Sequence, residues 1–430
     1  MLRLQSSDPG FAKDFAKLVG QRRETGEDVA HDVSRIIADV RSRGDAALRD
    51  LTNRYDGYTL DSDAAWRVPD SQIRAAFDEI SPDLRAALEL AAQRIHAYHE
   101  AQLPTDRDYT DEDGVRLGAK WFPVDSAGLY VPGGRAVYPS SLLMNAIPAK
   151  VAGVGRLAVT TPTPEGEINP LILAAAQIAG VDEIWRVGGA QAVAALALGT
   201  ERIARVDVIT GPGNAWVAEA KRQLFGTVGI DMIAGPSEIL VIADGKSDPE
   251  WLAADLLSQA EHDPLAQSIL ITDDPVLADT VADRVNVEIA MLPTARVASQ
   301  SWKANGVIIE VGSLDEAPAL SNALAPEHVE ICVDDPEPLF AQIRHAGSVF
   351  LGRQTPEAIG DYVAGPNHVL PTGRRARFSS GLSVLDFMKR TSFIQLDHAA
   401  LEKIGPAAIA LAEAEGLPAH ARSIETRLGI

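Results

Sequence analysis

The sequence feature that most constrains the fold is a repeated alternation of short apolar runs with helical patterns, which begins near residue 128. Three strand–helix units follow one another directly. They are "RLAVTTP" with "NPLILAAAQIAG", "EIWRVGG" with "AQAVAALALG", and "VDVITGPGN" with "AWVAEAKRQLFG". Successive units of this kind predict a parallel sheet with helices on both of its faces.

The alternation starts again at "SEILVIAD" and continues through "HVEICVDD" to "SVFLG". A chain of 430 residues is too long for one ordinary core, so the two arrays indicate two lobes. We therefore predict an α/β protein with two Rossmann-like lobes of an incomplete dinucleotide-fold type. Ligands of such folds bind in the cleft at the carboxyl ends of the strands.

The two ends of the chain have a different pattern. Residues 27–55 and 71–102 repeat apolar residues at helical spacing, which predicts helices. From about residue 382, "GLSVLDFMKRTSF" is followed by two helical stretches, "HAALEKIG" and "PAAIALAEAEG". This tail is too short to bury a core alone, so we expect it to dock elsewhere, for example on a partner subunit.

Charge and cysteine content exclude several classes of partner. The net charge of −21 repels phosphate backbones and anionic membrane surfaces, so we expect no nucleic-acid or membrane partner. Cys332 is the only cysteine, which rules out an intrachain disulfide and fits a reducing compartment. The N-terminus lacks the apolar core of a signal peptide, and no apolar run is long enough to cross a bilayer. We expect a cytoplasmic protein.

Three glycine clusters, at 128–134, 188–192 and 211–216, each follow a strand or open a helix. None has the G-x-G-x-x-G spacing, and each alone could be an ordinary tight turn. Three clusters on the same edge of one sheet indicate a nucleotide-type ligand. The polar residues Tyr130, Gln191 and Asn214 lie in or beside them and are suited to hydrogen-bonding a ribose or an amide.

Residues suited to metal binding are scattered along the chain. In "SQAEHDP", Gln259 and His262 lie nearly one helical turn apart, so both side chains share a face. Asp361 could supply a hard oxygen ligand, although a helix cap or turn explains it equally. His96 and His99 also share a helix face, but we expect a surface or packing role for them. No H-E-x-x-H or C-x-x-C pattern occurs.

In "LAPEHVEI", the adjacent Glu327 and His328 lie at the start of a predicted strand. A carboxylate and an imidazole there form a candidate acid/base pair, although an exposed loop pair explains the pattern equally well. In "AEAEGLPAHARS", Glu415 and His420 flank a Gly-Leu-Pro turn. The residues alone thus indicate a two-lobed enzyme with a nucleotide cleft and a candidate metal site, without naming a substrate.

Six long blocks, in order along the chain, resemble histidinol dehydrogenase. They are "GLYVPGGRAVYPSSLLMNAIPAKVAGV", "GPGNAWVAEAKRQLFGTVGIDMIAGPSE", "DLLSQAEHD", "APEHVEI", "GPNHVLPTGRRARFSSGLSVLDFMKRTSF" and "EGLPAHARS". The resemblance implies oxidation of L-histidinol to L-histidine through L-histidinal, with reduction of two NAD⁺, as the last step of histidine biosynthesis. It also implies one Zn²⁺ per subunit and a homodimer that exchanges its C-terminal tails.

The resemblance assigns roles to residues that already stood out. It implies Gln259, His262, Asp361 and His420 as zinc ligands, the last from the other subunit. His328 would be the general base, and Glu327 would activate the water that adds to the aldehyde. The implied substrate contacts are Ser237, Gln259, His262, His328, Asp361, Glu415 and His420. The implied NAD⁺ contacts are Tyr130, Gln191 and Asn214, whereas His368 receives no role.

These expectations give a division of the chain into four parts. We predict an N-terminal helical arm (1–26), a large α/β lobe with most metal and catalytic residues (27–129 plus 238–381), a second, NAD-binding lobe (130–237) and a C-terminal tail domain (382–430) that contributes to the partner's active site. Two alternatives stay open. One is a related zinc/NAD dehydrogenase for another small hydroxylated metabolite, such as a sulfonated propanediol; the other is a metal hydrolase or non-catalytic metabolite-binding protein.

Overall fold

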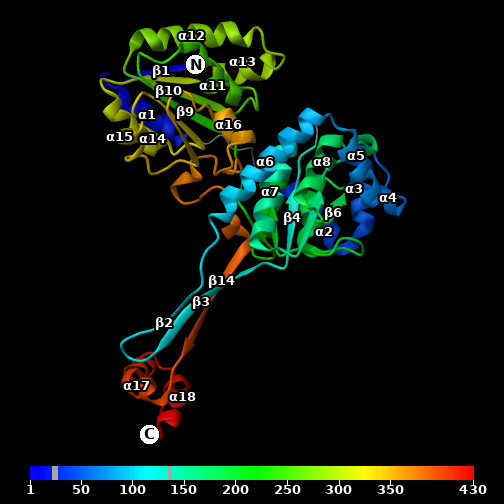
Figure 1. The fold of residues 1–430 in the computed structure, drawn as a ribbon, viewed down its shortest axis with the longest axis vertical. Helices are drawn as coiled ribbons and strands as arrows, with labels where there is room; N and C mark the ends of the chain where they lie inside the picture. Colours follow the sequence, from blue (N-terminus) through cyan, green and yellow to red (C-terminus); the bar gives the residue numbers. More distant parts are fainter. Residues whose placement is uncertain (22–27, 134–137, 234) are drawn as a thin grey trace.

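The computed structural model describes residues 1–21, 28–133, 138–233 and 235–430. Residues 22–26 of the predicted arm, residue 27 at the start of the predicted helix 27–55, and Gly134 of the first glycine cluster lie outside the described residues. The described strands form a six-stranded and a five-stranded parallel sheet and a three-stranded antiparallel sheet. Figure 1 shows two lobes, from which the antiparallel sheet extends to a small helical end that contains the C-terminus. The predicted α/β class with parallel sheets is confirmed.

The six-stranded sheet has the order β1-β11-β10-β9-β12-β13. Its strands are β1 (Leu2–Gln5), β9 (Glu238–Ala243), β10 (Gln267–Thr272), β11 (Val307–Glu310), β12 (His328–Cys332) and β13 (Ser348–Leu351). One face packs on α11 (Pro249–Ala260), α12 (Pro275–Ile289) and α13 (Ala295–Asn305), and the other on α1 (Phe11–Gly20), α14 (Ala317–Leu324) and α15 (Glu337–Phe340). Every residue of β9, β10 and β12 is buried, as expected for parallel strands covered on both faces.

The five-stranded sheet has the order β6-β5-β4-β7-β8. Its strands are β4 (Ser126–Tyr130), β5 (Arg156–Thr160), β6 (Glu183–Trp185), β7 (Val208–Thr210) and β8 (Gly229–Ile230). One apolar core joins it to α5 (Asp70–Glu79), α6 (Pro82–Glu100), α7 (Pro139–Ala152) and α8 (Pro170–Ala179), and another to α2 (Asp28–Arg43), α3 (Asp45–Asp56), α9 (Gly189–Leu198) and α10 (Ala215–Leu224). The strand order reverses between β4 and β7, the position where such sheets bind ligands.

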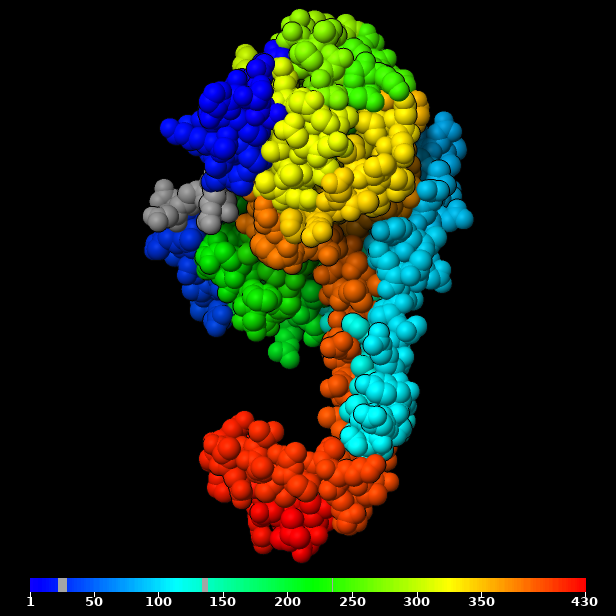
Figure 2. Space-filling view, turned by 90° about the vertical axis from the view of Figure 1, so that its left-hand side faces the viewer, coloured from blue at the N-terminus to red at the C-terminus, as the bar shows by residue number. Residues whose placement is uncertain are grey.

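The antiparallel sheet forms an arm with the order β14-β3-β2. Its strands are β2 (Arg107–Thr110), β3 (Arg116–Pro123) and β14 (Met388–Gln395), and it leads to α17 (His398–Ala414) and α18 (Pro418–Leu428). β14 pairs with β3 along its whole length, from Met388 opposite Pro123 to Gln395 opposite Arg116. Figure 2 shows open space between the helical end of this arm and the two lobes.

The predicted division of the chain differs from this packing at several places, among them β4, whose residues 126–129 were predicted in the large lobe but pair with β5 and β7. Residues 2–20, predicted as a helical arm, add β1 and α1 to the six-stranded sheet, where Leu4 and Leu18 are buried. Helices α2 to α6, predicted in the large lobe, pack instead on the five-stranded sheet, because their apolar faces join its two cores. Residues 107–123, also predicted there, form the arm with β14.

Two short helices, α4 (Asp63–Trp66) and α16 (Glu357–Tyr362), also pack in the two lobes. Trp66 of α4 lies in the core beside the five-stranded sheet. Helix α16 follows β13 and contacts α11. None of the helices in the described ranges combines the length and apolar character needed to span a bilayer.

Candidate active site

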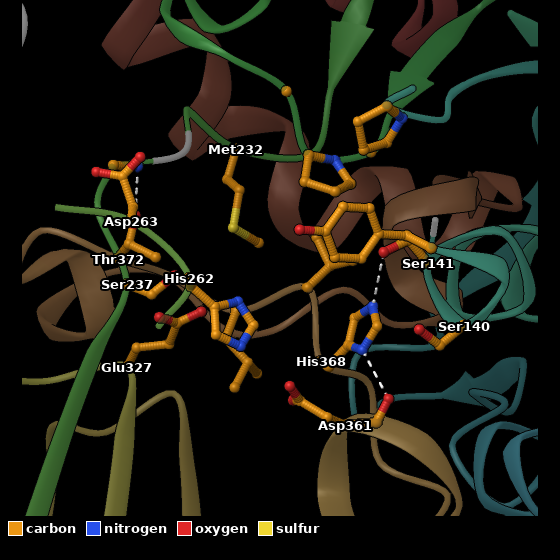
Figure 3. A pocket seen from close by; sticks show the side chains of 18 of the residues that line it. Ser140, Ser141, Met232, Ser237, His262, Asp263, Glu327, Asp361, His368 and Thr372 are labelled. Carbon is orange, nitrogen blue, oxygen red and sulfur yellow. Dashed lines mark hydrogen bonds between the residues drawn. The ribbon is translucent and has the colours of Figure 1, made fainter. Parts of the chain in front are cut away.

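A pocket lies where the two lobes meet, and residues from both lobes line it (Figure 3). The five-stranded lobe contributes residues after β4 and β7 and at the start of α7, including Pro132, Ser141 and Gly211. The six-stranded lobe contributes residues from the loops around β9, α11, β12 and α16. Among them are six residues of the predicted site: Ser237, Gln259, His262, Glu327, His328 and Asp361.

Strand β12 positions the predicted acid/base pair. His328 is its first residue and Glu327 precedes it, and both are almost fully buried. Both bond to the backbone of Glu238 on the adjacent strand β9: Glu327 Oε2 accepts a hydrogen bond from its N–H at 3.1 Å, and His328 Nδ1 lies 3.1 Å from its carbonyl oxygen. A carbonyl oxygen only accepts, so His328 Nδ1 carries the proton and Nε2 is left as an acceptor.

Burial sets the protonation of this pair in the protein. Removal from water raises the pKa of the Glu327 carboxyl well above its usual range. The same cause lowers the pKa of His328. The lowered pKa of His328 leaves the imidazole free to act as a base rather than being held as a cation. Burial disfavours the carboxylate form of Glu327, and a cation bound in the pocket would favour that form, which water activation requires.

The end of α11 places Gln259 and His262. The helix begins at Pro249 with the Asp248 side chain as its N-cap, which accepts a hydrogen bond from Glu250 N–H. Gln259 lies in the last turn, where it is buried, and its Oε1 has no hydrogen-bond partner among the described residues. A buried amide oxygen without a partner is costly, and a bound cation beside it would satisfy it.

Helix α16, which contacts α11, adds Asp361 to the pocket lining. Its start is held beside β12, because the buried Glu330 carboxylate accepts a hydrogen bond from the Glu357 N–H. Burial raises the pKa of Asp361 to about 8. A nearby cation would favour the carboxylate form. Gln259 and His262 line the same pocket as Asp361 and carry donor atoms of kinds that bind metal ions.

The sequence analysis did not identify Glu357. It is buried one helical turn before Asp361, with its Oε1 3.5 Å from His328 Nε2 and its Oε2 accepting a hydrogen bond from Ser258 Oγ at 3.1 Å. Ligand atoms of His328, Glu357 and Asp361 all lie within 4.8 Å of one another. The i,i+4 spacing of Glu357 and Asp361 on one helix was the signal that could have found it.

His368, which received no role, connects the two lobes. Its Nδ1 lies 2.9 Å from the Asp361 carbonyl oxygen, and its Nε2 lies 3.2 Å from Ser141 Oγ at the start of α7 (Figure 3). Burial lowers its pKa to about 4, so the ring stays neutral. It thus ties the loop after α16 to the five-stranded lobe.

The residues predicted to contact NAD⁺ lie at the carboxyl edge of the five-stranded sheet, outside the pocket lining. The Tyr130 hydroxyl, at the end of β4, accepts a hydrogen bond from Gly189 N–H at 3.1 Å. Asn214 caps α10 through hydrogen bonds from Trp216 and Val217 N–H. Gln191 is buried in the first turn of α9. Burial raises the pKa of Tyr130 to about 12, so it remains a phenol.

Two predicted site residues are not brought to this pocket within one chain. Glu415 directly follows α17 and His420 lies in α18, and both are exposed on the helical end of the arm (Figure 1). The other histidine pair, His96 and His99, forms no site with them: His99 is buried and its Nδ1 lies 2.7 Å from the Ile95 carbonyl oxygen.

Comparisons with known proteins give one consistent result. A family model described as "Histidinol dehydrogenase" matches residues 20–428. Histidinol dehydrogenase of Zymomonas mobilis is 61% identical over 428 residues, covering 100% of this chain and 99% of the relative. That of Ruegeria pomeroyi is 60% identical over 425 residues, covering 99% and 98%. The crystal structure of histidinol dehydrogenase from Elizabethkingia anophelis is 36% identical, with a TM-score of 0.94, and covers 100% of this chain and 98% of that one.

Proposed function

This chain belongs to the histidinol dehydrogenase family, and from that premise we propose that it uses Zn²⁺ and NAD⁺ in the pocket between its two lobes. It is an oxidoreductase of histidine biosynthesis, and its reaction is the final step, from L-histidinol to L-histidine. The observation that carries the proposal is a buried Glu327–His328 pair in the same pocket as the unpartnered Gln259 oxygen.

The metal ligands we propose are Gln259, His262 and Asp361 of one subunit and His420 of the partner subunit. The donor set of one imidazole, one amide oxygen and one carboxylate suits zinc, and a second imidazole completes four ligands. When bound, zinc supplies a Lewis acid that holds the nitrogen donors of an amino alcohol. Ser237 lies in the same lining and is suited to contact the substrate; Glu415 would reach it with His420.

His328 is the general base of this scheme. Its Nδ1 proton is held by the Glu238 carbonyl oxygen, so Nε2 accepts the alcohol proton as hydride leaves the carbon. Bound NAD⁺ would supply the acceptor for that hydride. Glu327 then activates the water that adds to L-histidinal, and loss of a second hydride gives the carboxylate. Two NAD⁺ are reduced for each L-histidinol.

NAD⁺ would bind at the carboxyl edge of the five-stranded sheet, near the reversal between β4 and β7. Tyr130 ends β4, Gln191 lies in α9 after β6, and Asn214 caps α10 after β7. This is where nucleotides bind in comparable sheets. The pocket with Glu327 and His328 lies next to it, so the reacting end of the cofactor would face the base.

A homodimer with exchanged tails would supply the missing residues. The helices α17 and α18 pack on each other and expose Ile404, Leu411 and Leu417. An exposed apolar surface on so small a unit favours burial against another chain. A second copy that receives this tail would gain Glu415 and His420 at its pocket. The buried single Cys332 is compatible with the cytoplasmic location that we also propose.

The test is an NADH assay with L-histidinol, run with and without a chelator. The proposal predicts two NADH for each L-histidinol consumed, and loss of the signal after zinc is removed. One NADH with accumulation of an aldehyde would contradict the four-electron reaction. An unaltered rate in zinc-depleted protein would contradict the metal. The dehydrogenase for a sulfonated propanediol is not favoured, because the full-length relatives are histidinol dehydrogenases.

A further inference from the structure

Two oppositely charged residues of the pocket, Lys221 and Asp231, have no part in the scheme above. Lys221 lies on α10, Asp231 directly follows β8, and both line the pocket. Their side chains form an ion pair and are only 3% and 1% exposed. A buried ion pair contributes little net stability, because the cost of desolvation offsets the attraction. Its presence at this place therefore needs another explanation.

Both members of the pair also bind the same backbone unit. The Lys221 ammonium donates a hydrogen bond to the Gly211 carbonyl oxygen at 3.0 Å, and Asp231 Oδ2 accepts one from the Gly211 N–H at 2.8 Å. Both polar groups of Gly211 are thus held by one ion pair. Lys221 and Asp231 come from different elements, so the loop after β7 is fixed between α10 and the end of β8.

Close packing restricts the backbone conformation of the loop at residues 211–213. Gly211 has a φ of 113°, and a Cβ there would lie 2.2 Å from the Tyr130 carbonyl oxygen. At Gly213 a Cβ would lie 2.4 Å from Val217 Cγ1. The backbone at Gly211 and Gly213 is therefore packed against the end of β4 and the first turn of α10, without room for a side chain at either position.

This loop of the five-stranded lobe also lines the pocket of the proposed chemistry. Gly211, Pro212 and Gly213 line the same pocket as Glu327 and His328, and they follow β7 at the reversal of the strand order. We propose that the Lys221–Asp231 pair is a positioning device for the dinucleotide, holding residues 211–213 in the shape that receives its nicotinamide end. The inference rests on the proposed function, because it concerns the NAD⁺ of that reaction.

The experiment removes both charges together. A single Lys221→Met change leaves the Asp231 carboxylate buried alone and is expected to lower the unfolding temperature. The double variants Lys221→Met/Asp231→Leu and Lys221→Gln/Asp231→Asn leave no lone charge, so stability recovers; two versions are made in case one does not fold. In a folded double variant, the KM for NAD⁺ and the Kd for NADH from fluorescence titration rise about 10-fold or more, because the loop is no longer preorganised. The kcat at saturating NAD⁺ and the KM for L-histidinol change less than about 2-fold.

The matched control is Lys150→Met. Lys150 forms an ion pair with Asp182 at 3.0 Å in the same lobe, but its side chain is 32% exposed and does not line the pocket. This variant should keep the wild-type affinity for both forms of the cofactor.

Two results would overturn the inference. One is a folded double variant with wild-type NAD⁺ KM and NADH Kd, which would leave the pair a purely structural role. The other is an equal loss for cofactor, substrate and kcat, which would indicate general damage. Measurements on the wild-type protein distinguish failure of this inference from failure of the proposed function. If the wild-type protein neither binds NADH nor oxidises L-histidinol, the proposed function itself is contradicted, whatever the variants do.

Discussion

At the scale of single residues, the chemistry depends on how one backbone unit orients two neighbours. Glu238 N–H donates to Glu327, while the Glu238 carbonyl oxygen fixes the proton on His328 Nδ1. Both proposed catalytic side chains are therefore oriented by β9, a strand that is buried along its whole length. A rigid strand holds acid/base groups more accurately than a loop would.

The two residues of this pair should separate the two halves of the reaction. His328→Ala removes the base and should lower kcat about 10²- to 10⁴-fold for both L-histidinol and L-histidinal. Glu327→Gln keeps an oxygen that can accept from Glu238 N–H but cannot activate water, so it should slow mainly the aldehyde half. NADH formation from each substrate, measured separately, checks this. Equal losses in both halves for Glu327→Gln would refute the division of roles.

The metal site has its own test at this scale. His262→Asn should lower the zinc bound per subunit well below one, since it removes a ligand, while circular dichroism shows a retained fold. The control His96→Asn changes an exposed histidine on α6 and should keep the zinc. Stoichiometric zinc in His262→Asn would mean that our ligand set is wrong.

The sequence predicted the candidate site unevenly. Gln259 and His262 share one segment, and Glu327 and Asp361 come from two others, yet the structure brings all four to one pocket. Glu357 and the Lys221–Asp231 pair were missed, because a lone carboxylate or lysine in a helix or loop is usually a solvated surface group. Only the tertiary contacts show that these charges are buried.

At the scale of elements, strands were easier to predict than helix boundaries. The apolar runs at 238–243, 267–272 and 328–332 are strands as the alternation predicted. The predicted helix at 27–55 is divided at Gly44, where φ is 52° and a Cβ would meet the Glu201 carboxylate. Conversely, the two helical stretches predicted in the tail form one helix, α17, which continues through Pro406. Gly405 leaves room there for Ile424 and Leu428 of α18.

The strands of the arm gave no usable pattern. The residues of β2 are all exposed, and most residues of β14 are exposed. Neither face of this sheet therefore requires apolar residues. Alternation identifies a strand only when one face is buried. Pairing between residues more than 260 positions apart, such as Arg116 with Gln395, also has no local signal.

Helix α16 offers a test of how an element supports the site. Gly360 is buried, and a Cβ there would lie 2.6 Å from the Phe350 ring of β13. Gly360→Ala should push α16 outward, lower the free energy of unfolding by about 1–3 kcal/mol and weaken zinc binding through Asp361. Denaturant unfolding and zinc titration measure the two effects.

The control for that variant is Gly20→Ala at the end of α1, where an added Cβ meets nothing within 4 Å. It should leave both the free energy of unfolding and zinc binding nearly unchanged. A Gly360→Ala variant as stable as this control would show that α16 is not closely packed on Phe350.

At the scale of the whole molecule, the lobes and the C-terminal tail contribute different residues to the proposed site. The two parallel sheets place one pocket between them, whereas the arm carries Glu415 and His420 away from that pocket (Figures 1 and 2). A single chain therefore presents Gln259, His262 and Asp361 at one end and His420 at the other. We infer that the complete site needs two chains, which sequence periodicity alone could not predict.

Subunit complementation tests this central claim most directly. The inactive variants His262→Asn and His420→Asn are unfolded together, mixed in equal amounts and refolded, and NADH formation from L-histidinol is measured. If the tails are exchanged, each mixed dimer contains one site with all wild-type ligands, and random pairing should restore about one quarter of wild-type activity. Each variant refolded alone should stay inactive. No recovery in a mixture shown to contain mixed dimers would contradict a site shared between two chains.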